Sequence, residues 1–254
     1  MLKDIFTIST LRFKLLRINF LDTISIQIRA LVTILPYLLF VDYFKVSNEI
    51  NIMFIVVSFL ITLYLGNNII MISMYMLDEK KKGRTNYYKI MNISTIKIML
   101  GNIIPWLVVS LLGIIFTYIV VSFLLNFRYT EVNIPLAILI FILVSVQSVL
   151  LGNIICYFVL KRNNIRIVFY VFSLILFFSG YLYPIAVLPI YLRFIAFLNP
   201  LYYGLDLIRY YLSINPATQI NVSIEWAIFI ASMILLLSVN WILISTKKFE
   251  KSFI

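Results

Sequence analysis

Long apolar segments recur along the whole chain, and they restrict it to a bundle of membrane-spanning helices. Six segments are long enough to cross a bilayer, because a hydrocarbon core of about 30 Å takes roughly 20 apolar residues as helix and contains no water to satisfy an open backbone. The residues are 63% hydrophobic and 12% charged, with a mean hydropathy of +1.05, far from the balance of a soluble domain. We therefore predict an all-α, polytopic membrane protein whose residues 1–254 form a single transmembrane domain.

The expected spans are separated by short polar, charged or proline-rich segments. They cover about residues 24–44, a stretch ending near Met76, residues 99–125, residues 134–160, a stretch ending near Tyr183, and residues 226–244. A tight basic turn at 161–166 joins the fourth span to the fifth.

Residues 1–21 precede the first span and contain no continuous apolar core that ends in a small-residue cleavage site, so they are not a signal peptide. Polar side chains recur there every three or four positions, which gives one hydrophilic stripe on an otherwise apolar helix: Lys3, Thr7, Thr10, Lys14 and Arg17. This pattern predicts an amphipathic helix in the membrane interface. It is either a lead-in to the first span or part of a docking surface for a partner.

The net charge of +11 reflects membrane topology rather than nucleic-acid binding. With the N-terminus inside, all but four of the 21 basic residues fall in cytoplasmic segments, the exceptions being Lys45, Arg128, Arg193 and Arg209. This asymmetry follows the positive-inside rule and places both termini in the cytoplasm, with the plasma membrane as the expected location. The chain has no histidine and one cysteine, Cys156, so we expect no catalytic residue and no metal site in it.

Residues 77–98 form the only long charged interruption between two apolar runs. Basic residues surround Gly83, a helical pattern follows, and Ser94 offers an N-cap for the next helix. We expect a short helix on the cytoplasmic face, where a soluble partner acts on the membrane part.

The segment before the last span is too hydrophobic for an ordinary loop, yet Pro184, Pro189 and Pro200 prevent it from forming one span. It predicts two short helices, about 190–198 and 201–212, that re-enter the outer leaflet within residues 184–212. Asp206 and Arg209 are three residues apart and can pair, either at the surface or partly buried.

Two further patterns concern packing. The tyrosines of the second short helix fit an aromatic interface belt: Tyr202, Tyr203, Tyr210 and Tyr211. A repeated glycine–asparagine pair begins at Gly66, Gly101 and Gly152, where it either packs helices closely or lines a pathway through Asn67, Asn68, Asn102 and Asn153.

Two separated motifs resemble those of the permease subunit of type-2 ATP-binding-cassette exporters. Before the last span, Asn199, Pro200 and Leu201 are followed by the Asp206–Arg209 pair and preceded by Gly180, Pro184 and Pro189. In the charged segment, Glu79 and Gly83 are similar to the family's coupling helix, although Lys81, Arg84 and Asn92 depart from its pattern. With the six expected spans, the resemblance covers nearly the whole chain.

The resemblance implies a half-transporter that pairs with a second, identical or related permease and with separate ATPase subunits, which bind the ATP and Mg²⁺. The chain itself has no phosphate-binding loop of the G-x-x-x-x-G-K-[ST] type, so no cofactor is expected on it. The coupling residues implied are Glu79, Lys80, Lys82, Gly83, Arg84, Thr85 and Tyr88. The cargo implied is a lipophilic drug, a peptide or a lipid-like molecule.

Other classes of membrane protein stay open. A secondary transporter or channel usually places charges at mid-membrane, whereas here the acidic residues, Glu225 among them, fall at span ends or in loops. A membrane scaffold or immunity protein is the remaining alternative.

Overall fold

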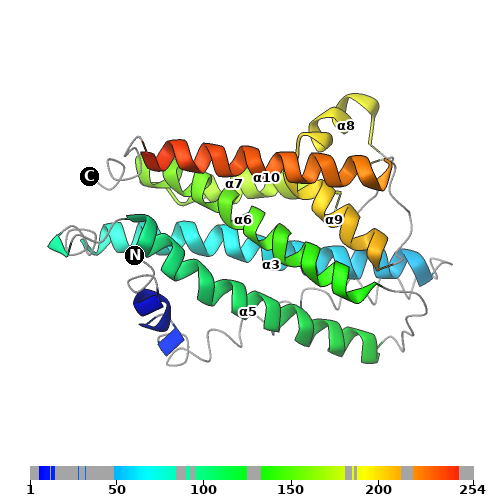
Figure 1. Ribbon diagram of the computed structural model, residues 1–254, viewed down its shortest axis with the longest axis horizontal. Coiled ribbons are helices and arrows are strands. Elements are labelled where there is room, and N and C mark those ends of the chain that lie inside the picture. Colours follow the sequence, from blue (N-terminus) through cyan, green and yellow to red (C-terminus); the bar gives the residue numbers. More distant parts are fainter. Residues whose placement is uncertain are drawn as a thin grey trace.

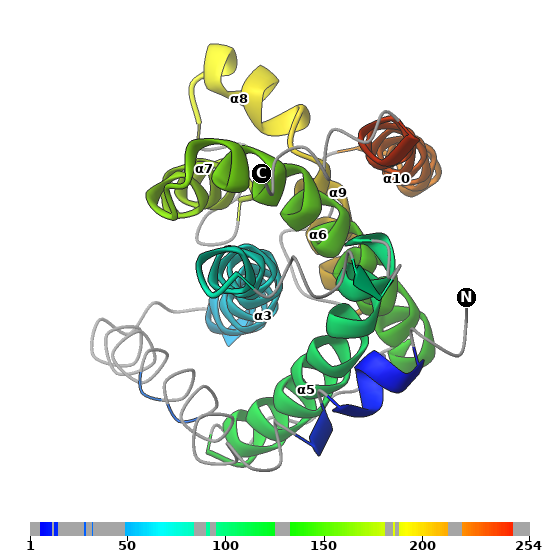
Figure 2. The same cartoon turned by 90° about the vertical axis from the view of Figure 1, so that its left-hand side faces the viewer.

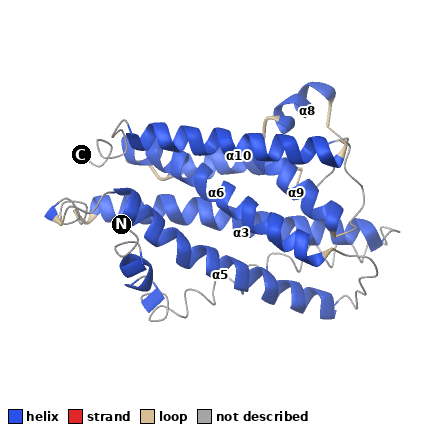
Figure 3. Ribbon diagram, in the orientation of Figure 1, coloured by secondary structure: helices blue, strands red, loops and turns tan. Residues whose placement is uncertain are grey.

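The structure, a computed structural model, describes residues 6–11, 13–14, 28, 32, 49–83, 90–91, 95–124, 133–180, 185, 188–212 and 220–245. Every regular element in these residues is a helix, as predicted (Figure 3). The long helices run roughly along one direction of the molecule, and the short helices α8 and α9 lie towards one end (Figure 1). The helices are α3 (Glu49–Lys81), α5 (Thr95–Leu124), α6 (Ile134–Arg162), α7 (Arg166–Phe177), α8 (Ile190–Phe197), α9 (Pro200–Tyr211) and α10 (Val222–Ser245).

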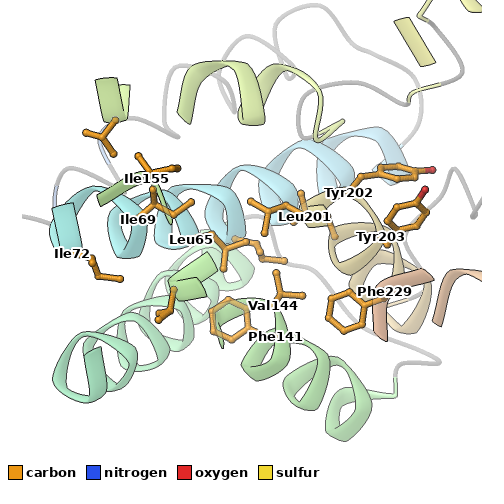
Figure 4. Packing of buried hydrophobic residues seen from close by; sticks show 14 of the residues in the cluster. Leu65, Ile69, Ile72, Phe141, Val144, Ile155, Leu201, Tyr202, Tyr203 and Phe229 are labelled. Carbon is orange, nitrogen blue, oxygen red and sulfur yellow. The ribbon is translucent and has the colours of Figure 1, made fainter. Parts of the chain in front are cut away.

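Helix α3 is the centre of the bundle. It contacts α5, α6, α7 and α9, and in the end-on view α5, α6 and α7 surround it (Figure 2). Its buried side chains recur every three or four residues along one stripe: Ile61, Leu65, Ile69, Ile72 and Met76. Figure 4 shows Leu65, Ile69 and Ile72 of this stripe in one cluster with side chains of α6 and α9.

Two of the described helices are long and apolar enough to cross a bilayer, namely α6 and residues 222–243 of α10. Helix α6 matches the predicted fourth span at its start and extends it to Arg162. Helix α10 begins four residues before the predicted start of the last span, at Val222 instead of Trp226. The predicted first span at 24–44 lies almost entirely outside the described residues.

The fifth expected span is shorter than predicted. Helix α7 has 12 residues, or about 18 Å at 1.5 Å per residue, and a turn rather than further helix follows it at 178–180. Gly180 in this turn has φ +67°, a left-handed conformation that glycine adopts without strain and that ends a helix.

At the N-terminus, residues 6–11 and 13–14 are helical, in agreement with the predicted helix over 1–21. Ser9 is buried, and Ile8 packs against the core cluster. The placement of this helix in the membrane interface remains a prediction.

The contact between α3 and α6 depends on Gly152. A Cβ atom at this position would lie 3.1 Å from the Cα atom of Ile69, so a side chain here would push on backbone. We expect Gly152→Val to lower the free energy of unfolding by about 1–3 kcal/mol, the usual cost of overpacking. Thermal unfolding in detergent measures it, with Ala227→Val on the exposed side of α10 as the matched control. Equal stability of the two variants would contradict the close approach of the two helices.

Candidate functional site

The charged segment predicted at 77–98 begins inside a helix rather than after one. Helix α3 continues to Lys81, past Met76, near which we predict the end of the second span. The charged side chains from Asp78 to Lys81 extend the helix beyond its apolar part without a break. Within this segment the structure also describes residues 82–83, 90–91 and 95–98, whereas Arg84, Thr85 and Tyr88 lie outside the described residues.

The end of α3 is hydrogen-bonded to the end of α6. Lys80 donates a hydrogen bond from Nζ to the carbonyl oxygen of Leu160, at 3.1 Å, which satisfies a carbonyl in the last turn of α6. Glu79 is buried, with 2% of its surface exposed, so its side chain faces this chain. The two basic helix ends, at Lys80–Lys81 and at Lys161–Arg162, therefore lie at one end of the bundle, as the positive-inside pattern requires.

The end of α3 presents the side chains of Lys81 and Lys82 outward, and both are exposed. Lys82 forms an ion pair with Asp78 at 2.7 Å, and such an exposed pair stabilises the helix by only about 0.3–0.5 kcal/mol. Gly83 follows with φ +68°, and a Cβ atom there would meet nothing within 4 Å. Glycine is thus required at this turn by its backbone conformation and not by crowding.

Arg209 on α9 is the centre of a buried polar cluster. Its Nε atom donates to the hydroxyl of Ser58 on α3 at 2.7 Å, and its Nη2 atom donates to the carbonyl of Gly180 after α7, also at 2.7 Å. Its Nη1 atom lies 3.8 Å from Oδ1 of Asp206, and Tyr202 donates its hydroxyl to Oδ2 of Asp206 at 3.3 Å. With 2% and 6% exposure for Arg209 and Asp206, the pair is buried, and the interpretation as a surface ion pair is wrong.

The Asn199–Pro200 motif starts α9. The side chain of Asn199 accepts a hydrogen bond from the backbone N–H of Leu201 at 3.1 Å, and its amide donates to the carbonyl of Ile175 on α7 at 2.7 Å. Pro200 occupies the first helical turn, where its missing N–H costs nothing. Pro189 likewise precedes α8 as its N-cap residue, whereas Pro184 lies outside the described residues.

The tyrosines of α9 do not form one interface belt. Tyr202 and Tyr203 are 3% and 4% exposed, and Figure 4 places them within the core cluster. Tyr203 donates its hydroxyl to the carbonyl of Phe197 at 2.7 Å, which satisfies its polar end. The belt interpretation therefore fails for these two, while Tyr210 is exposed.

Asn67 lines a partly open cavity of about 220 Å³ between α3 and α7. A Cβ atom on Gly66 would lie 2.0 Å from the ring of Phe172, so this glycine lets the ring approach α3. The lining is mainly apolar, with the amide of Asn67 and the hydroxyl of Thr62 as its polar groups, and it comprises Thr62, Leu63, Gly66, Asn67, Ile70, Phe172 and Leu176.

The other asparagines of the repeat differ from Asn67. Asn68 is buried and joins three helices, because it donates to the hydroxyl of Ser148 on α6 at 3.4 Å and accepts from that of Ser110 on α5 at 2.9 Å. This bears out the packing interpretation for Asn68. Asn153 is half-buried, and its Oδ1 has no hydrogen-bond partner in the described part of the chain. The side chain of Asn102 lies outside the described residues.

Sequence reasoning missed Glu225, in the first turn of α10. Its side chain is fully buried, and neither carboxyl oxygen accepts a hydrogen bond among the described residues. Its carboxyl group interacts with that of Asp206. The helical pattern could have indicated its burial, since Glu225 shares a helical face with the buried residues Phe229, Leu236 and Asn240.

Removal of Arg209 should destabilise the protein strongly. We expect Arg209→Met to lower the free energy of unfolding by about 3–5 kcal/mol, because Asp206 is left buried without its cation. Adding Asp206→Asn should recover part of the loss in a double-mutant cycle, followed by chemical denaturation. The matched control is Arg193→Met, which removes one hydrogen bond to the carbonyl of Leu188 on a half-exposed side chain. A loss no larger than that of the control would contradict the central role of Arg209.

A comparison with known protein families covers the region that contains these features. The sequence profile of the family described as ABC-2 type transporter matches residues 9–212, which include α3 to α9 and thus the charged end of α3, the cavity and the Arg209 cluster. No match was found among curated proteins. Since the matched region covers most of the chain and its apolar helices can cross a bilayer, this is a membrane protein, and it belongs to the ABC-2 type transporter family as a permease subunit.

Proposed function

We propose that this chain is the permease subunit of an ATP-driven exporter, which moves a lipophilic drug, a peptide or a lipid-like molecule out of the cell. ATP and Mg²⁺ are bound and used by a separate ATP-binding-cassette subunit, and a second permease, identical or related, completes the pathway. All six predicted spans cross the plasma membrane with both termini in the cytoplasm, and α8 and α9 re-enter the outer leaflet.

The observation that carries this proposal is the continuity of α3. The same helix provides one wall of the cavity, from Thr62 to Ile70, and ends in the exposed charges at Lys81 and Lys82. Ile70 and Lys81 are about 17 Å apart along the helix axis at 1.5 Å per residue. A partner that pushes on the charged end therefore moves the cavity wall as one rigid element, provided that it binds the two permease states with different affinity.

The chemistry of the cavity supports an amphipathic cargo. An aromatic ring, aliphatic side chains, one amide and one hydroxyl line it, and none of the described residues that line it is charged. Such a surface binds apolar molecules and orients them through a small number of hydrogen bonds. Exposed apolar side chains on the outer faces of α5 and α10, among them Phe116, Ile119, Ile234 and Trp241, are suited to lipid or to the second permease.

The decisive experiment is purification of the tagged chain from its own membranes in mild detergent, with mass spectrometry of the proteins that accompany it. We expect a near-stoichiometric ATPase subunit that carries a phosphate-binding loop, and ATP-dependent substrate movement after reconstitution of the complex into liposomes. A chain that purifies alone, under conditions that preserve a known transporter complex, would refute the proposal. Substrate or ion movement that does not need ATP would instead indicate a secondary transporter or channel.

The exposed charges at the end of α3 should couple the ATPase to the permease. We expect Lys81→Glu with Lys82→Glu to abolish stimulation of ATP hydrolysis by substrate and to slow transport at least about tenfold, which corresponds to 1.4 kcal/mol of lost interaction. Thermal stability should change little, since both side chains are exposed. The matched control is Lys161→Glu with Arg162→Glu, an exposed basic pair at the neighbouring end of α6. Equal effects of the two charge reversals would show a general charge effect and not coupling through α3.

The cavity should determine substrate affinity. We expect Phe172→Ala to raise the KM for transport by up to about tenfold, as expected for the loss of one aromatic contact, and Asn67→Leu to change which substrates are carried. The control is Phe169→Ala, one turn away on α7, whose ring is exposed. If Phe172→Ala and its control give the same KM as the unaltered complex, the substrate binds elsewhere.

A further inference from the structure

Helices α9 and α10 meet at two carboxyl groups, those of Asp206 and Glu225. The transport mechanism proposed above uses neither of them. The helices approach closely at Gly204, where a Cβ atom would lie 3.1 Å from the ring of Phe229. One turn earlier on α10, Glu225 interacts with Asp206 of α9. The next residue of α10, Trp226, donates a hydrogen bond from Nε1 to the hydroxyl of Tyr211 on α9, at 3.1 Å. The two carboxyl groups are therefore held together by the packing of the helices.

The charges around this pair do not balance if both carboxyl groups are ionised. Arg209 is committed to its neighbours on α9, α3 and the turn after α7, and its positive charge offsets that of Asp206. Glu225 then remains as an uncompensated negative charge with no exposed surface and no donor to either oxygen within the described residues. Burial of such a charge is far more costly than burial of the neutral acid. The N-terminus of α10 favours the carboxylate, but this effect is small beside the cost of burial.

Among the described residues, no other titratable group supplies the missing charge. From α9 the groups that face this pair are Tyr202, Tyr203 and Arg209, of which Tyr202 already donates to Asp206 and Tyr203 to Phe197. Helix α6 also packs on α10, but its residues 134–149 include no charged or titratable side chain.

We propose that the Glu225–Asp206 pair is a proton-binding site, in which the carboxyl group of Glu225 carries the proton and donates it as a hydrogen bond to Asp206. One proton restores neutrality to the cluster and joins α10 to α9. A small metal cation is the less suitable ligand, because it requires four or more oxygen or nitrogen ligands. The described residues contain no group of three or more acidic, cysteine or histidine side chains that could hold a metal ion. This inference does not depend on the proposed export function.

Infrared spectroscopy of the full-length chain in lipid nanodiscs tests the site directly. At neutral pH we expect the carbonyl-stretch band of a protonated carboxyl group, which Glu225→Gln removes. Asp78→Asn, the matched control, changes a carboxyl group that forms an ion pair with Lys82 at the surface and should leave the band in place. Absence of the band from the unaltered protein, or its persistence in Glu225→Gln, would overturn the proposal.

A second measurement distinguishes a bound proton from a purely structural carboxylate. The folded protein binds one proton more than the unfolded chain, so its folding equilibrium should weaken as pH rises, by up to about tenfold per pH unit. Glu225→Gln should fold, because its amide also donates to Asp206, and should lose this pH dependence. Failure of Glu225→Gln to fold, or a pH dependence equal to that of the unaltered chain, would show that Glu225 is ionised. If Na⁺ or K⁺ stabilises the unaltered protein but not Glu225→Gln, the site binds a metal cation and not a proton.

Discussion

The arrangement of the helices depends on how one buried guanidinium group is satisfied. Arg209 reaches from α9 to the hydroxyl of Ser58 on α3 and to the carbonyl of Gly180 after α7, so three segments that are distant in the sequence meet at one side chain. In an apolar bundle, van der Waals packing permits several registers, whereas an unpaired buried charge excludes all but the register that pairs it. Asn199 caps the start of α9 and Arg209 lies in its last turn, so these contacts fix α9 at both of its ends. Helix α9 is thus anchored in the core, whereas α8 exposes most of its side chains and buries Ala196.

Helix α3 links this anchored region to the opposite end of the bundle. At one end Ser58 holds Arg209, at mid-length Asn68 bonds to Ser110 and Ser148, and at the other end Lys80 bonds to the last turn of α6. Polar contacts therefore recur along the helix between long apolar stretches. Such contacts, each worth about 0.6 kcal/mol on average between membrane helices, fix the rotation and height of α3 more than they stabilise it. A force on the charged end is then transmitted along the helix rather than lost by local slippage.

Hydropathy and proline positions were enough to predict much of the fold. The all-helical class, the start of α6 at Ile134 and the two short helices on either side of Asn199 follow from apolar run length and from the inability of proline to continue a helix. Hydropathy did not predict that α3 continues to Lys81, because Glu79, Lys80 and Lys81 are charged but are also good helix formers, and hydropathy does not separate a membrane boundary from a helix boundary. The Asp206–Arg209 pair was predicted from its spacing. Its burial was left open, since burial depends on Ser58 and Gly180, which only the tertiary structure brings to it.

The burial of Glu225 shows what position along a span can and cannot indicate. The residue lies at the start of an apolar run, where a charge normally reaches water or the lipid headgroups, and on that basis it was assigned to a span end. In the bundle, however, α9 covers the first turn of α10, so the depth of Glu225 is determined by its neighbour and not by its distance from the end of the helix. The same covering by α9 brings Asp206 against it. Charges that look peripheral in a linear sequence can therefore form the interior of a membrane protein wherever short helices fold back over the ends of the spans.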